Sequence, residues 1–91
     1  ITLSNAVTAH GSGNITLTAN GTASDLTVSQ NSGVSSTSGN ITLSADRTVT
    51  ISEDVSTGGS GTLTVTGNSA TGARNIIVDS GAVVSVVDGN L

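Results

Sequence analysis

The sequence predicts an all-β fold, a parallel β-solenoid of triangular cross-section, from three observations. The segment Gly13–Ala19 returns almost unchanged as Gly39–Ala45 and more loosely as Gly61–Gly67, and such a recurrence is typical of repeat architectures. Apolar residues alternate with Thr or Ser inside each copy, as in a half-buried strand. The 91 residues include no Phe, Tyr, Trp, Met or Cys, so a stack of coils suits this composition better than a small globule does.

Two types of strand alternate along the chain. The first type is represented by Ile15–Ala19, whose apolar residues face the core and whose Thr16 and Thr18 face solvent. The second type occurs four times, as Ile1–Ser4, Leu26–Ser29, Val49–Ser52 and Ile76–Asp79. The first apolar residue of each second-type strand is separated from the first apolar residue of the next first-type strand by 14, 15, 14 and 15 residues in turn. Because a one-residue slip would turn an apolar set outward, this spacing predicts that like strands stack in register.

A third apolar position follows each strand of the second type and is occupied by Val7, Val34, Val55 and then Ala82 or Val84. We interpret it as a short third strand, which gives about three and a half coils of 22–28 residues. Asn14 and Asn40 are expected to stack at one corner, with Asn90 as a candidate third member, and to bond through their side-chain amides along the column.

Residues 1–91 are expected to form a single β-solenoid segment. Neither end of the pattern resembles a polar cap, which repeat proteins need at a terminal coil. We therefore expect an excerpt of a longer repeat protein or a filament subunit. The expected partners are further coils of the same chain or identical subunits stacked end to end.

The charge balance excludes several classes of partner. Two Arg against six Asp and Glu give a net charge of −4, whereas nucleic-acid affinity depends largely on a basic surface. Acidic character also opposes binding to anionic lipid, and no apolar run reaches the length of a membrane-spanning helix. We expect no nucleic-acid partner and no membrane insertion.

No group of residues predicts catalysis, a cofactor or a metal site. His10 has no Cys or second His with which to share a metal, and the Gly-rich Gly58–Gly61 lacks the Lys of a phosphate-binding loop. One adjacent acidic pair provides too few oxygens for calcium. We interpret all six acids as solvated turn residues: Asp25, Asp46, Glu53, Asp54, Asp79 and Asp88. The chain is therefore not expected to be an enzyme.

The repeated Gly-Asn-Ile-Thr-Leu-(Thr/Ser)-Ala, the Thr-Val-(Thr/Ser) strand and the Val-Ser-Thr-Gly-Gly of Val55–Gly59 resemble the repeats of filamentous-haemagglutinin-type adhesins. The resemblance covers nearly the whole chain. These adhesins are long bacterial exoproteins secreted by the two-partner route, and they fold as right-handed parallel β-helices. The resemblance therefore implies an extracellular or bacterial cell-surface shaft that gives length and rigidity for attachment. It does not identify a host receptor, and the apolar run 83–87 leaves the register of the last coil (76–91) open.

The outward residues of the first strand type suggest an alternative function. They form a regular array of hydroxyl side chains, at Thr16, Thr18, Thr42, Ser44, Thr64 and Thr66. Such arrays resemble the ice-binding surface of several antifreeze proteins, although Thr also suits the exposed face of any sheet. Three Asn-x-Thr sequons, at Asn14, Asn20 and Asn40, are candidate glycosylation sites. Asn20, which precedes Gly21 in an expected turn, is the most accessible of them.

Overall fold

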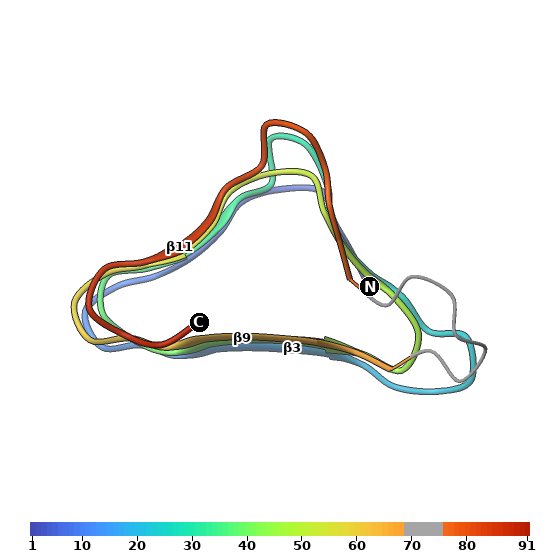
Figure 1. Ribbon diagram of the computed structural model, residues 1–91, viewed down its shortest axis with the longest axis horizontal. Coiled ribbons are helices and arrows are strands. Elements are labelled where there is room, and N and C mark those ends of the chain that lie inside the picture. Colours follow the sequence, from blue (N-terminus) through green and yellow to red (C-terminus); the bar gives the residue numbers. More distant parts are fainter. Residues whose placement is uncertain (69–75) are drawn as a thin grey trace.

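The computed structural model of the protein describes residues 1–68 and 76–91, and these residues wind into a parallel β-solenoid (Figure 1). Three complete coils are followed by a partial fourth, and each complete coil adds one strand to each of three sides. Seen along the coil axis, the three sides make a triangle. The predicted all-β solenoid is therefore confirmed. The 13-residue separation from Leu63 to Ile76 predicts a long corner at 67–75. Only residues 67 and 68 of this corner are described, and Arg74 lies outside the described residues.

Every strand pairs in parallel with the equivalent strand of the next coil. The first side consists of β1 (Thr2–Leu3), β4 (Leu26–Val28), β7 (Val49–Ile51) and β10 (Ile76–Val78). The second side consists of β2 (Val7–Ala9), β5 (Val34–Ser36), β8 (Val55–Thr57) and β11 (Val84–Val86). The third side consists of β3 (Ile15–Ala19), β6 (Ile41–Ala45) and β9 (Leu63–Gly67).

The register of the third side is the one that the spacing predicts. Ile15 pairs with Ile41 and Ile41 with Leu63, and the small residues at the other strand end pair in the same way. On the second side Val84 pairs with Val55, which decides between Ala82 and Val84 in favour of Val84. The last coil therefore continues the register of the coils before it.

The core is a set of aliphatic columns that run along the coil axis. Leu43 is completely buried between its column neighbours Leu17 and Val65, which are only partly buried. Burial of one such side chain contributes about 1.5–3 kcal/mol before the entropy of ordering is subtracted. Because aromatic rings are absent, stability depends on many such modest contributions repeated from coil to coil.

A column of glycines lets successive coils approach closely at one corner. Gly39 lies so near the coil beneath that a Cβ atom would come within 3.0 Å of the Gly13 carbonyl, and Gly61 stands in the same relation to Gly39. The carbonyls in this column are also hydrogen-bonded by buried hydroxyls, since Ser36 Oγ donates to the Gly13 oxygen at 2.7 Å and Thr57 Oγ1 to the Gly39 oxygen at 2.5 Å. This position therefore requires glycine wherever a coil lies beneath it.

The coils are of two shapes, and the shapes alternate. Between the first and second sides, the corners of coils one and three have three residues (4–6 and 52–54), whereas those of coils two and four have five (29–33 and 79–83). Between the second and third sides the order is reversed, with five residues in coils one and three (10–14 and 58–62) and four in coil two (37–40). Figure 1 shows both alternations, as corners that reach outward in every second coil. A wide corner therefore always lies on a narrow one.

Equivalent corners repeat their backbone geometry as well as their length. Asn31 and Gly81 hold the same place in the wide first corners, with φ of 64° and 90°, in the left-handed region where glycine and asparagine are favoured. Gly11 and Gly59 hold the same place in the wide second corners, with φ of 62° and 53°. The repeating unit of the solenoid is therefore a pair of coils.

The asparagine column forms, but its hydrogen bonds differ from the expected ones. Asn14 Oδ1 accepts the backbone N–H of Asn40 at 2.8 Å, and Asn40 Oδ1 accepts the backbone N–H of Thr62 at 2.9 Å. Each side chain thus bonds to the backbone of the next coil rather than to another side-chain amide. The physical reason is that the corner leaves a backbone donor directly above each amide oxygen, and such a donor needs a partner.

Candidate functional site

The outward hydroxyl array lies on the third side. Thr16, Thr42 and Thr64 pair in one row of equivalent positions, and Thr18, Ser44 and Thr66 pair in a second row. Four of these side chains are exposed and those of the middle coil are partly buried. The predicted array is therefore a two-by-three grid on one sheet. Within it, Ser44 Oγ donates a hydrogen bond to Thr18 Oγ1 at 3.2 Å, so one hydroxyl is engaged by its neighbour.

The three sequon asparagines are all exposed, but their environments differ. The side-chain oxygens of Asn14 and Asn40 accept backbone N–H groups of the next coil. Asn20 lies beyond the end of β3, in a corner where its backbone carbonyl accepts a hydrogen bond from Ser24 Oγ at 2.9 Å. A glycan on Asn20 would lie outside the asparagine column, whereas Asn14 and Asn40 belong to that column.

Acidic side chains hydrogen-bond across coils at the corners. Asp46 Oδ2 accepts the N–H of Gly21 at 2.7 Å, and Glu53 Oε2 accepts the N–H of Asn31 at 3.1 Å. Asp54 Oδ1 accepts the N–H of Val83 at 2.9 Å. These acids were expected to be solvated turn residues, and they do lie in turns. They also satisfy backbone donors of adjacent coils, a role that sequence reasoning missed.

Asp25 and Arg47 form an ion pair between the second and third coils. Arg47 Nε lies 2.7 Å from Asp25 Oδ1, and Arg47 Nη2 lies 2.5 Å from Asp25 Oδ2. The backbone N–H of Thr48 also donates to Asp25 Oδ1 at 3.2 Å. The hydrogen bond from Arg47 lowers the pKa of Asp25, against the opposing effect of desolvation. Because both side chains are substantially exposed, this pair contributes little energy at neutral pH.

We expect Asp25→Asn to reduce the acid sensitivity of the fold. The lowered pKa of folded Asp25 means that the unfolded state binds this proton more readily, so the contribution to stability is present above pH 3.8 and is lost as the pH falls through the folded pKa. Thermal unfolding followed by far-UV circular dichroism should therefore depend less on pH in this window than it does for the unsubstituted chain. Arg47→Gln should act in the same direction, and the double variant should add little. An acid dependence unchanged by both substitutions would contradict the assignment.

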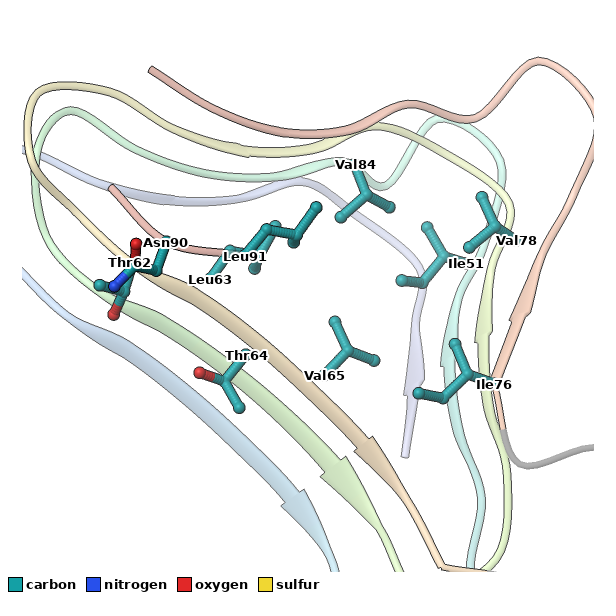
Figure 2. Close-up of a pocket in the computed structure, with 10 residues that line it drawn as sticks. All are labelled: Ile51, Thr62, Leu63, Thr64, Val65, Ile76, Val78, Val84, Asn90 and Leu91. Carbon is teal, nitrogen blue, oxygen red and sulfur yellow. The ribbon is translucent and has the colours of Figure 1, made fainter. Parts of the chain in front are cut away.

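The C-terminal face of the solenoid holds an open apolar cavity of about 720 Å³ (Figure 2). Ile76, Val78 and Val84 line it from the last coil, and Ile51 and Val65 from the coil beneath. In Figure 2 these side chains point into the triangle, whereas Thr64 points away from it. The cavity is thus the core cross-section itself. Of the apolar run 83–87 in the sequence, Val84 contributes to this surface.

The described residues around His10 and the acidic side chains form no metal site. His10 is exposed in a corner, and the described residues hold no group of three or more His, Cys, Asp or Glu that could bind a metal ion. In that part of the chain there is also no helix that is long and apolar enough to cross a membrane.

Comparison with known proteins adds no relative. The chain matches no family model, no curated protein and no solved structure. The resemblance to filamentous-haemagglutinin-type repeats therefore depends on the residues quoted above.

Proposed function

We propose that the chain is a structural segment of a bacterial adhesin-type fibre, located outside the cell or on its surface, that provides length and rigidity for attachment. The observation that supports this function best is the continuity of all three sides from coil to coil in one register. Such an architecture extends along its axis without limit, because each coil contacts only its neighbours. On this proposal the chain has no enzymatic activity.

Lengthening the solenoid tests this function. In a variant that repeats residues 1–48 after Thr48, the added pair of coils should fold in register with the rest. Small-angle X-ray scattering should then show a compact particle that is longer along the coil axis by about 10 Å, since each coil adds about 4.8 Å. Several such insertions should give rods in electron micrographs. An expanded or less ordered particle after the first insertion would reject the shaft function.

A second candidate function, ice binding, is favoured by one observation, the two-by-three hydroxyl grid of the third side. On this function the chain inhibits ice recrystallisation, and Thr42→Leu at the centre of one row removes the inhibition. Thr50→Leu, an outward residue of the first side, is the matched control and leaves it unchanged. A folded chain without inhibition rejects this candidate.

A further inference from the structure

We propose that Asn20 is a site of spontaneous deamidation and that the Asp46 carboxylate slows this reaction in the folded chain. Asn20 directly precedes Gly21, and asparagine is among the thermolabile residues. The inference concerns the chemical lifetime of one corner of the solenoid, and it does not depend on the proposed shaft function.

The reaction needs only the chain itself and water. The Gly21 backbone nitrogen bonds to Asn20 Cγ, its proton passes to the side-chain amide nitrogen, and that nitrogen leaves as ammonia. The product is a cyclic imide that contains the former Gly21 nitrogen. Water then opens this ring at either carbonyl, which gives aspartate or isoaspartate at position 20. The net change replaces an NH2 group by an OH group.

The corner after β3 leaves the attacking nitrogen accessible. Both Asn20 and Gly21 are exposed, and glycine has no side chain to shield its nitrogen. Gly21 has a φ angle of 118°, which residues with a side chain rarely adopt. The conformation of the corner therefore favours glycine directly after Asn20, so the fold itself maintains the labile dipeptide.

The other two sequon asparagines are protected by the residues that follow them. Ile15 and Ile41 are buried, and both have β-branched side chains that crowd the backbone nitrogen. The Ile15 N–H donates to the Asn40 carbonyl at 2.9 Å, and the Ile41 N–H donates to the Thr62 carbonyl at 2.8 Å. Attack by either nitrogen would break a hydrogen bond between coils, so Asn14 and Asn40 should stay intact.

Asn31 is a closer comparison, because it is exposed in a corner and precedes the small residue Ser32. Ser32 is completely buried, and its N–H donates to the Ser29 carbonyl at 3.1 Å. The nitrogen that would attack Asn31 is therefore enclosed, whereas the Gly21 nitrogen belongs to an exposed residue. Exposure of the following residue, rather than of the asparagine, distinguishes the two sites.

Asp46 of the next coil restrains the Gly21 nitrogen. Its Oδ2 atom accepts the Gly21 N–H at 2.7 Å, and hydrogen bonds to a charged acceptor are stronger than neutral ones. The attack requires this bond to break, and the negative charge beside the nitrogen opposes the loss of its proton. Ser24 Oγ restrains the same corner by donating to the Asn20 carbonyl at 2.9 Å. The native corner should therefore react more slowly than one without Asp46.

Either product would weaken the contact between the first two coils. Aspartate at position 20 adds a negative charge next to the residue that Asp46 binds. Isoaspartate routes the main chain through Cγ, which lengthens the corner and turns the carbonyl bonded by Ser24 Oγ into a free carboxylate. Deamidation of Asn20 thus limits how long this corner keeps its native geometry.

Prolonged incubation of the chain in neutral buffer, followed by peptide mass spectrometry, tests the site. Asn20 should give two products of equal mass that separate by chromatography, the aspartate and isoaspartate forms. Its conversion should be at least about tenfold faster than that of Asn14, Asn40 or Asn31, which corresponds to about 1.4 kcal/mol in the barrier. Absence of conversion at Asn20, or conversion at the rate of the other three, would overturn the proposal.

Asp46→Ala tests the restraint. This variant should deamidate at Asn20 about tenfold faster while its circular dichroism spectrum stays unchanged. Glu53→Ala is the matched control, because Glu53 also accepts a backbone N–H of the adjacent coil, that of Asn31, but in a different corner. It should leave the rate at Asn20 unchanged. A rate unaffected by Asp46→Ala, or raised equally by both substitutions, would contradict the role of Asp46. The two-coil insertion tests the shaft function separately, so that function stands or falls independently of these results.

Discussion

Gly39→Ala should destabilise the solenoid by about 3 kcal/mol, at the upper end of the usual cost of overpacking. The new methyl group would lie within 3.0 Å of the Gly13 carbonyl and of the Ser12 oxygen, both of which are backbone atoms. The same carbonyl accepts the hydrogen bond of the buried Ser36 hydroxyl, so a shift of the corner would also break a buried polar contact. Because these neighbours are backbone atoms, accommodating the methyl group requires the backbone of this corner to move.

Gly13→Ala is the matched control, since it makes the same change in the same column. Its methyl group meets only Ala9 Cβ and the His10 carbonyl, both at 3.2 Å, so a small adjustment suffices and the cost should stay below about 1 kcal/mol. Urea unfolding followed by far-UV circular dichroism measures both variants, because the chain has no aromatic residue for fluorescence. Equal losses of stability in the two variants would show that the close approach of coils is not what requires glycine.

Leu43→Ala should lower the free energy of unfolding by about 3 kcal/mol, within the range measured for buried Leu in other proteins. Leu43 is fully buried in the middle coil, where neighbours above and below hold the walls of the resulting cavity in place. A loss of this size is a large fraction of the stability of a small domain. The variant should therefore unfold at clearly lower urea concentration and temperature.

Leu17→Ala removes the same side chain from the same column one coil away. Leu17 is only partly buried at the N-terminal face, so the transfer free energy is smaller and the cavity opens to solvent. We expect a loss of about 1 kcal/mol. If Leu17→Ala lowered the free energy of unfolding as much as Leu43→Ala does, the burial of each side chain would not determine the cost of removing it from this column.

The strand positions and their register could be predicted from the sequence because both follow from side-chain alternation. The spacing from Ile1 to Ile15 and from Leu26 to Ile41 already fixes which residues face inward. The pairs of Ile15 with Ile41 and of Leu43 with Val65 are those that the spacing predicts. Local pattern suffices here because in a parallel stack the partner of each residue is its own equivalent in the next coil.

The corners could be predicted only in outline, because their geometry depends on atoms of two coils at once. The hydroxyls of Ser36 and Thr57 are buried on glycine carbonyls of the coil beneath, and the side-chain alternation within one coil does not predict these contacts. The asparagine column was predicted with the wrong acceptor–donor pairs for the same reason. The separations of 14 and 15 residues reflect the alternation of coil shapes. Each separation spans two corners, however, so a difference of one residue does not show which corner is wide and which is narrow.

The alternating corners restrict how a gene for such a solenoid can grow. Ile1 and Val49 are 48 residues apart, and Leu26 and Ile76 are 50 apart, so equivalent corners recur after two coils. A crossover between misaligned DNA repeats therefore keeps each wide corner on a narrow one only when it adds or removes two coils together. Insertion or deletion of a single coil would place two wide corners, or two narrow corners, on each other and disturb the packing at that junction. Selection on natural length variants should therefore retain changes in steps of two coils and eliminate odd ones.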